Sequence, residues 1–576
     1  MNAVARASLE PVARLHPCGL VTPVCLLSSL VSMGVVSCGG DQTTDTGTTS
    51  AATTTAETTE DPVPTTGAAT SSSTSSTDPS TDPSSTSSTA STAATTTTDG
   101  EPALEIAHGV RLTRVTATQG VQIEIVRDGL EVPASEYAVA LISRRKTVLR
   151  ADWSLHATFT PRPLIGRLTL WTPEGDIHVD TSEVTVDGPS NDGDLGKTFA
   201  WQLPPELVRP GMEYRIEAFE ADPALTTGDI SDPPPILPLA GRGTLQVEDN
   251  PMTIRVELIP IKHVFNGMTC MPAITEADVT AMRQWMEQHN PVEQADIFVG
   301  EPMEYTESIG MSDGGFVPIL TELGKRRALV KPPPNLYYYG LLDSCDEYPP
   351  GLLGQAYGIP DMPSMNLGFQ RIATGRWLGS GAAARDTFVH EIGHTQGRYH
   401  VRCSGGEAGT DNAYPYPNGR IGVWGYGIHD TQLRSPTGFR DYMSYCNTSF
   451  VSDYGWQQTY NHIKELSSWD AAGPLAQGTP LLLGTIDEGG HANFWTTHGQ
   501  VPQRGRGPGT SVEFDTGQQV LTLPASVTEI PDSQAHAIAV ALPAQWAAVK
   551  LLRLKVPGQP DVVAVRSAVT ELHASP

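Results

Sequence analysis

The stretch HEIGHTQGRYH, residues 390–400, constrains the fold of this chain more than any other feature of the sequence. Residues four apart share one face of an α-helix, so His390 and His394 point the same way if the pattern of residues 384–397 is helical. Gly397 can adopt a left-handed backbone conformation and end the helix at little cost. The chain can then turn and bring His400 back. We therefore expect a helix, a glycine turn and a return segment that gather three imidazoles.

Three imidazoles and an adjacent carboxylate point to zinc chemistry. A catalytic zinc normally has three protein ligands and one open position, and His390, His394 and His400 supply three nitrogens. Glu391 stands in the H-E-x-x-H arrangement, where the glutamate is the general base. We predict one catalytic Zn²⁺ at this site. The alternative is a surface helix with solvated histidines, or a site that has lost its activity.

Two motifs together give a family resemblance. The full stretch reads H-E-x-x-H-x-x-G-x-x-H, and Asp-Tyr-Met-Ser-Tyr-Cys follows at 441–446. With these motifs the sequence resembles the metzincin zinc endopeptidases, over about residues 253–470. The resemblance implies that Met443 forms an apolar floor under the imidazoles, and that zinc lowers the pKa of a bound water for Glu391 to deprotonate. It also implies that Tyr445 ligates zinc or stabilises the transition state; a packed aromatic side chain is the alternative.

The segment between the motifs departs from well-known subfamilies. Val401 follows the third histidine, where several of them carry a characteristic polar residue or proline, and the segment after it is rich in Gly, Tyr and Pro. It is more similar to bacterial cell-surface metzincins, including the secreted mucin-cleaving group, than to astacins. We expect either a specificity loop or a long surface connection. Asp411 and Glu407 are candidates for a structural Ca²⁺ there, although their spacing matches no known calcium motif.

The N-terminal hundred residues predict export and tethering. Arg6 and Arg14 precede an apolar stretch, residues 19–37, and Cys38 follows. We predict a lipoprotein signal peptide and lipobox over 1–38, with Cys38 lipidated; an uncleaved anchor helix is the alternative. Residues 39–102 are rich in Ser and Thr and have too few apolar side chains to bury a core, so we expect a disordered linker. The expected location is a bacterial outer membrane or cell surface.

The rest of the chain predicts a multidomain protein: a metzincin-like α/β (α+β) catalytic domain flanked by β-sandwich-like domains. Short runs of β-branched and aromatic residues separated by turn residues indicate a β-sandwich-like domain at 103–252. Strands alternate with helices over 253–472, the predicted peptidase domain. Strand patterns return in a small C-terminal β-domain, 473–576. Within the peptidase domain we expect helices at 278–290, 317–330, 384–397 and in 450–466, and strands at 335–343 and 364–370.

The cysteines support an exported protein. Removing the signal and setting Cys38 aside leaves four of the seven, an even number that suggests two disulfides with three possible pairings. These four are Cys270, Cys345, Cys403 and Cys446. Cys403 and Cys446 bracket the segment between the two motifs, so that pair is favoured. The cysteines before the catalytic domain all lie in the predicted signal or at Cys38, so no pro-segment with a cysteine switch is apparent, and the sequence does not show how such an enzyme would be kept latent.

The net charge of −27 argues against nucleic acid, because binding a phosphate backbone requires a basic surface. The sequence predicts a monomeric zinc endopeptidase that hydrolyses extracellular or cell-envelope proteins or glycoproteins and contacts a membrane through its lipid anchor. One alternative is a surface-anchored protein- or glycan-binding module with an inactive or structural zinc site. Another is a non-peptidase zinc hydrolase acting on a different amide.

Overall fold

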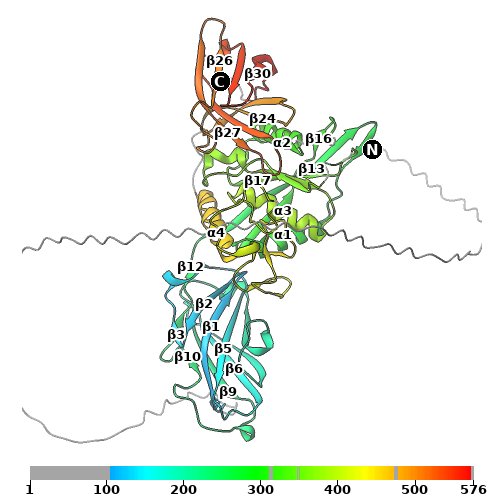
Figure 1. Ribbon diagram of the computed structural model, residues 1–576. Coiled ribbons are helices and arrows are strands. Elements are labelled where there is room, and N and C mark those ends of the chain that lie inside the picture. Colours follow the sequence, from blue (N-terminus) through cyan, green and yellow to red (C-terminus); the bar gives the residue numbers. More distant parts are fainter. Residues whose placement is uncertain are drawn as a thin grey trace, which may run out of the picture. The chain divides into compact units, whose positions relative to one another are not determined.

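The computed structural model describes residues 104–309, 315–346, 348, 351–405, 407–471 and 478–572. The predicted signal peptide, Cys38 and the predicted linker lie outside the described residues. The described part is a strand-rich mixed α/β protein with several sheets (Figure 1). Within it, no helix combines the length and apolarity needed to cross a membrane.

Two antiparallel sheets form the region that was predicted to be a β-sandwich. One has the order β3-β2-β1-β5-β8 and the other β10-β9-β6-β7, and their buried side chains belong to one apolar cluster. Gly166 in β6 shows how closely the sheets approach, since a Cβ there would lie 2.4 Å from the ring of Phe199 in β8. The strands are β1 (Val110–Thr118), β2 (Gln122–Arg127), β3 (Leu130–Glu131), β5 (Thr147–Leu155), β6 (Arg162–Trp171), β7 (Ile177–Val186), β8 (Phe199–Leu203), β9 (Glu213–Glu220) and β10 (Ile236–Leu237). The short strands β4 (Leu141–Ile142) and β12 (Val247–Glu248) pair with each other, and β11 (Gly243–Thr244) pairs with β9.

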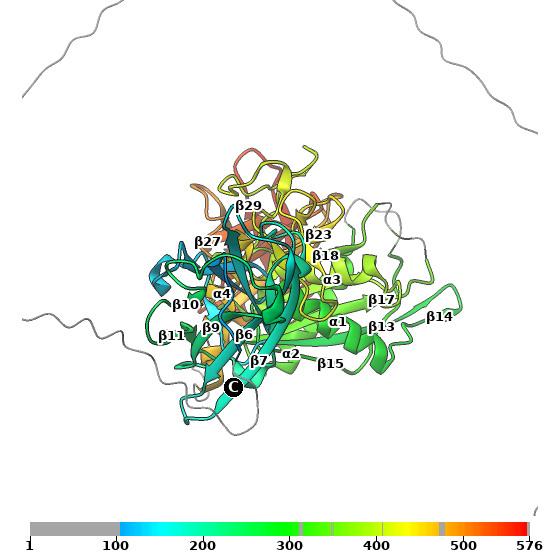
Figure 2. The ribbon, with the colours of Figure 1, turned by 90° about the horizontal axis from the view of Figure 1, so that it is seen from below.

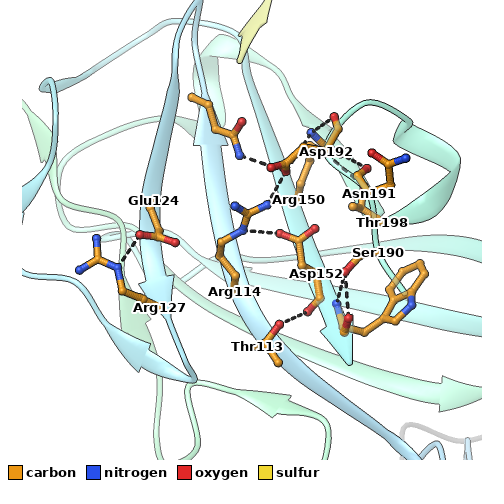
Figure 3. A network of polar contacts seen from close by, with 12 residues as sticks. Thr113, Arg114, Glu124, Arg127, Arg150, Asp152, Ser190, Asn191, Asp192 and Thr198 are labelled. Carbon is orange, nitrogen blue, oxygen red and sulfur yellow. Dashed lines mark hydrogen bonds and ion pairs between the residues drawn. The ribbon is translucent and has the colours of Figure 1, made fainter. Parts of the chain in front are cut away.

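A polar network joins β1, β5 and the segment before β8 (Figure 3). The Arg114 guanidinium donates to Asp152 at 2.7 Å and also pairs with Asp192. Arg150 donates to the backbone oxygen of Asp192 at 3.0 Å. Both carboxylates are therefore paired with arginine side chains, and the network holds these segments of the sheet together.

The central sheet carries the candidate site and has the order β14-β13-β17-β19-β18, with β15 and β16 also pairing with β13. Strands β13, β17 and β19 are parallel, and β18 is an antiparallel edge strand. Every side chain of β17 is buried. Tyr337 and Tyr339 belong to one apolar cluster and Tyr338 and Leu342 to another, as expected for a parallel strand covered on both faces. The strands are β13 (Thr253–Phe265), β14 (Met268–Cys270), β15 (Gln294–Val299), β16 (Met303–Tyr305), β17 (Leu336–Leu342), β18 (Gly354–Ala356) and β19 (Ile372–Arg376).

Four α-helices cover this sheet, at the positions expected from the sequence. They are α1 (Glu276–His289), α2 (Val317–Val330), α3 (Ala382–Thr395) and α4 (Asp453–Ser468). Thr275 and Asp278 form a capping box that starts α1, and Ser452 caps α4. Figure 2 shows α1 and α3 beside the sheet, where α1 contacts β15 and α3 contacts β17 and β19.

One expected strand is wrong. Residues 364–370 begin at Ser364 and form a 3₁₀ helix, Met365–Gln370, rather than a strand. The alternation of Met365, Leu367 and Phe369 over so short a run does not distinguish the two structures. Tertiary contacts decide the conformation, because the Asn366 carbonyl accepts a hydrogen bond from the amide of Gln500.

The last sheet is antiparallel, in the order β25-β24-β28-β27-β26-β29-β30. This sheet packs on α2. A Cβ on Gly324 of α2 would lie 2.8 Å from the ring of Trp495, and the hydroxyls of Thr321 and Thr485 are 2.7 Å apart. Leu481 and Leu483 share an apolar cluster with α2 and β17. The strands are β24 (Thr479–Ile486), β25 (Ala492–Gly499), β26 (Ser511–Asp515), β27 (Val520–Glu529), β28 (His536–Ala541), β29 (Leu551–Lys555) and β30 (Val562–Val565).

Two disulfides join the four cysteines, Cys270–Cys345 and Cys403–Cys446. The second is the pair that the sequence favoured. Disulfides form and persist in oxidising compartments, so they indicate an extracellular or periplasmic protein.

We expect stability to fall in acid because of His462 in α4. Burial lowers the pKa of this histidine to about 3, and its Nε2 has no partner among the described residues. An unfolded chain binds a proton there with a pKa of about 6.5, so the unfolded state gains protons first as the pH falls. The stabilisation is complete above about pH 6.5 and is lost at about 1.4 kcal/mol per pH unit down to the folded pKa.

Urea unfolding of the parent and of His462→Leu at pH 7 and pH 5 measures this effect. Only the difference between the two chains is used, so that other titrating groups cancel. Equal losses of unfolding free energy in the two chains between pH 7 and pH 5 would exclude the assignment.

Candidate metal centre

The end of α3 is shaped by Gly397. The amide of Gly397 donates to His394 and the amide of Arg398 donates to Gly393, at 2.9 and 3.0 Å. These are the two bonds of a Schellman motif, which needs a left-handed residue after the helix, and Gly397 has φ +88°. The glycine turn predicted from the sequence therefore directs the chain toward His400.

We expect Gly397→Ala to weaken both the fold and metal binding at the candidate site that includes His400. A left-handed alanine costs about 1–2 kcal/mol, and its Cβ would lie 3.0 Å from the Pro360 carbonyl. Urea unfolding and the rate of zinc transfer to a chromogenic chelator measure the two effects. Gly379→Ala is the matched control, since Gly379 has φ +68° but open space around it. Zinc loss at the same rate from both variants would show that the turn does not position His400.

Three buried imidazoles converge on one point. The Nε2 atom of His394 lies 3.1 Å from that of His390 and 3.0 Å from that of His400. On the other side of each ring, Nδ1 faces a backbone carbonyl at 2.7–2.8 Å: His390 that of Tyr442, His394 that of Arg398, and His400 that of Ala408. A carbonyl can only accept, so each Nδ1 carries a proton, and in the neutral ring each Nε2 presents a lone pair.

This arrangement fits a metal ion. In neutral rings, the three Nε2 lone pairs repel one another because no proton lies between them. A cation at this point removes that repulsion. Zinc–nitrogen bonds in tetrahedral geometry place the nitrogens about 3.3 Å apart, close to the observed separations. The backbone carbonyls also fix the tautomer and orientation of each ring, as outer-shell partners of metal ligands do.

Burial sets the charge state of the site. It lowers the pKa of His390 and, together with the two neighbouring histidines, that of His394, so both rings stay neutral and able to ligate. Burial also acts to lower the pKa of His400, but the Asp532 carboxylate outweighs it and the pKa is raised. The pKa of Glu391 is raised by burial and then by the negative charge of Asp532.

Met443 packs against α3 at Gly393. It is fully buried, and a Cβ on Gly393 would lie 2.5 Å from its sulfur, so only glycine fits at position 393. The Met443 carbonyl accepts from the Val401 amide at 2.8 Å, which joins this turn to the segment carrying His400.

A buried ion pair that sequence reasoning missed holds the segment 441–446, here called the methionine turn. Asp441 is fully buried; it accepts from the amide of Met443 at 3.0 Å and from the Ser452 hydroxyl at 2.5 Å. Its carboxylate is also 3.4 Å from the Arg398 guanidinium. Arg398 lies between Gly397 and His400, so the pair connects the two motifs. The position of Arg398 inside the histidine motif was the only signal in the sequence that could have indicated this ion pair.

Asp532 is the second residue that sequence reasoning missed. It belongs to the turn between β27 and β28, and one of its carboxylate oxygens lies 3.3 Å from His400 Nε2. Four potential ligand atoms, from the three histidines and Asp532, all lie within 4.8 Å of one another. Nothing in the local sequence around Asp532 marks it, because a Pro-Asp-Ser turn is ordinary between strands.

Tyr445 reaches the same point. Its hydroxyl is 3.1 Å from His400 Nε2 and donates to Asp532, while the side chain is about half exposed. Its ring also lies 4.8 Å from that of His400, centroid to centroid, and its catalytic role stays a prediction.

The two residues considered for calcium have other partners. The Glu407 carboxylate accepts from the amides of Cys403, Ser404 and Gly405. Burial acts against ionisation, but these donors hold the pKa of Glu407 at about 2. Asp411 accepts from the Tyr454 hydroxyl at 2.8 Å. Among the described residues, no group of three or more possible metal ligands contains both, and a calcium site remains a prediction.

A cleft of about 990 Å³ opens at the histidine cluster. Its lining includes His390, Glu391 and Tyr445, and also Gly354 of the edge strand β18. Glu488, Asp532 and Gln534 of the C-terminal sheet region line it as well. The described residues therefore combine a candidate metal centre with space for a ligand beside it.

No protein-family model matches the chain, and no curated protein matches it. Among solved structures, the chain is similar to metalloproteinase-II from Bacteroides fragilis, at 15% identity and a TM-score of 0.19, covering 49% of this chain and 78% of that one. A likeness at this level says nothing about the activity of this chain.

Proposed function

We propose that this chain is a zinc-dependent endopeptidase, with His390, His394 and His400 as the metal ligands and Glu391 as the general base. The observation that carries the proposal is the convergence of three Nε2 lone pairs, with every Nδ1 bonded to a backbone carbonyl. Bound zinc supplies Lewis acidity to a water and to a substrate carbonyl.

Glu391 is proposed to move the protons of hydrolysis. It follows the first histidine on α3 and lines the cleft, and its Oε2 has no hydrogen-bond partner among the described residues. A carboxylate so placed takes a proton from water and returns it to the leaving amine. A structural zinc site would have no use for such a base, which weighs against the binding-module alternative.

Tyr445 is proposed to stabilise the negative charge that develops on the substrate carbonyl oxygen. Its hydroxyl reaches the histidine cluster from a half-exposed position, and a donor aimed at such an oxygen lowers the barrier.

The edge strand favours a polypeptide over another amide. Strand β18 ends the order of the central sheet, and its Gly354 lines the cleft. An extended peptide can add to such an edge through main-chain hydrogen bonds, which places a peptide bond near the histidines. Export, a lipid anchor at Cys38, a monomeric state and a protein or glycoprotein substrate in the cell envelope complete the proposal.

Metal analysis together with cleavage tests the proposal. We expect one zinc per chain and cleavage of a mixed protein and glycoprotein panel that is abolished by a chelator and restored by added zinc. Bound zinc with cleavage of non-peptide amides alone would favour the alternative of a non-peptidase zinc hydrolase. Absence of zinc from chain purified with the metal present would refute the site.

A further inference from the structure

Asp532 completes a group of four potential metal ligands with the three histidines. A catalytic site has three protein ligands and one position for water or substrate, whereas a site with four protein ligands is closed. The carboxylate lies 3.3 Å from His400 Nε2 and within 4.8 Å of all three ligand nitrogens. Carboxylate oxygen is an ordinary zinc ligand, so the four atoms form a chemically complete set.

Hydrogen bonds hold the turn that carries Asp532 in the closed conformation. Ile530 and Ala535 are fully buried and bonded to each other through the backbone at 2.9 Å. The Pro531 carbonyl accepts from the buried side-chain amide of Gln355 in β18, at 3.0 Å, and Gln355 in turn accepts from the Phe316 amide. The turn is thus attached to the edge strand that borders the cleft.

The backbone at Asp532 is held in an uncommon conformation. Its φ is +61°, in the left-handed region that side chains other than glycine seldom adopt. Such a conformation persists where the surroundings fix it. Here the surroundings direct the side chain, which is only 11% exposed, at the histidine cluster and the Tyr445 hydroxyl.

We propose that Asp532 is the fourth protein ligand of the metal and that it keeps the enzyme latent until the 530–535 turn moves out of the cleft. In the closed state Asp532 takes the position that water needs, and Tyr445 donates to the carboxylate instead of to substrate. The inference rests on the proposed function, because latency has meaning only for an enzyme.

Two substitutions at Asp532 separate ligation from simple hydrogen bonding. Asp532→Ala removes both, whereas Asp532→Asn keeps an oxygen that accepts from Tyr445 but is a poor zinc ligand. Glu529→Gln, an exposed acid-to-amide change three residues away, is the matched control. The full chain is used throughout, loaded with Co²⁺ for spectroscopy or with Zn²⁺ for activity.

The first readout is access to the metal. Acetohydroxamate is titrated into the Co²⁺ protein while the visible absorption of the metal is followed. We expect both Asp532 variants to bind it at least tenfold more tightly than the parent and Glu529→Gln. The second readout is cleavage, which should rise at least tenfold in both Asp532 variants.

The outcomes separate the two proposals. Tighter acetohydroxamate binding without any cleavage would support ligation by Asp532 and overturn the peptidase and its latency. Cleavage by the parent, with equal cleavage and acetohydroxamate binding in both variants, would overturn the closed site and leave the peptidase. If Asp532→Asn behaves like the parent while Asp532→Ala is altered, Asp532 acts as a hydrogen-bond acceptor and not as a metal ligand.

Discussion

Replacing Glu391 by Gln should lower the rate of peptide cleavage by about 10²–10⁴, the contribution of a positioned general base. The amide has nearly the same shape as the carboxylate and cannot take a proton from water. Because Glu391 lines the cleft but is not one of the four clustered ligands, the variant should keep its zinc. The measurement is initial cleavage rate together with zinc per chain, in the parent and in the Asp532→Ala chain, so that latency does not hide the loss.

Glu529→Gln again serves as the control, since Glu529 lies outside the cleft lining. An unchanged cleavage rate in Glu391→Gln with zinc bound would remove Glu391 from the mechanism. Loss of zinc together with activity would show that Glu391 supports the metal rather than the proton transfer.

Replacing Asp441 by Ala should destabilise the protein by about 3–5 kcal/mol, because it leaves the guanidinium of Arg398 buried without its partner. Both side chains are almost completely buried. The variant also removes the acceptor for the Met443 amide and the Ser452 hydroxyl, so the methionine turn should loosen. Urea unfolding gives the free energy, and zinc transfer to a chelator gives the effect on the site.

The double variant Arg398→Met with Asp441→Ala distinguishes a charge effect from a packing effect. With neither charge of this buried pair left, the double variant should recover much of the stability lost in Asp441→Ala. A double variant less stable than Asp441→Ala would mean that Arg398 contributes through packing on Tyr442, which it faces at 5.5 Å, more than through its charge.

The sequence predicted the local parts of the site because their signals are local. The spacing of His390 and His394 on a helix and the conformational freedom of Gly397 depend on neighbours along the chain, and the structure has both features. The strand at Leu336–Leu342 was also predictable, because a run buried on both faces is apolar throughout.

Asp532 could not be predicted, because its role depends on where the C-terminal sheet packs. The sequence predicted strands within residues 473–576, but not that Trp495 would pack on α2 and that the turn carrying Asp532 would face the histidines. The strand predicted at 364–370 was wrong for the same reason, because the conformation of this segment depends on a contact with Gln500, far along the chain.

The Cys403–Cys446 disulfide bears on when and where the protein becomes competent to bind metal. It closes a loop with a sequence separation of 43 residues between the third histidine and the methionine turn. Closing a loop of this length removes about 4 kcal/mol of chain entropy from the unfolded state. In a reducing cytosol the two thiols stay apart, and the segment that presents His400 lacks this restraint. Newly made chains should therefore bind metal weakly until they are oxidised.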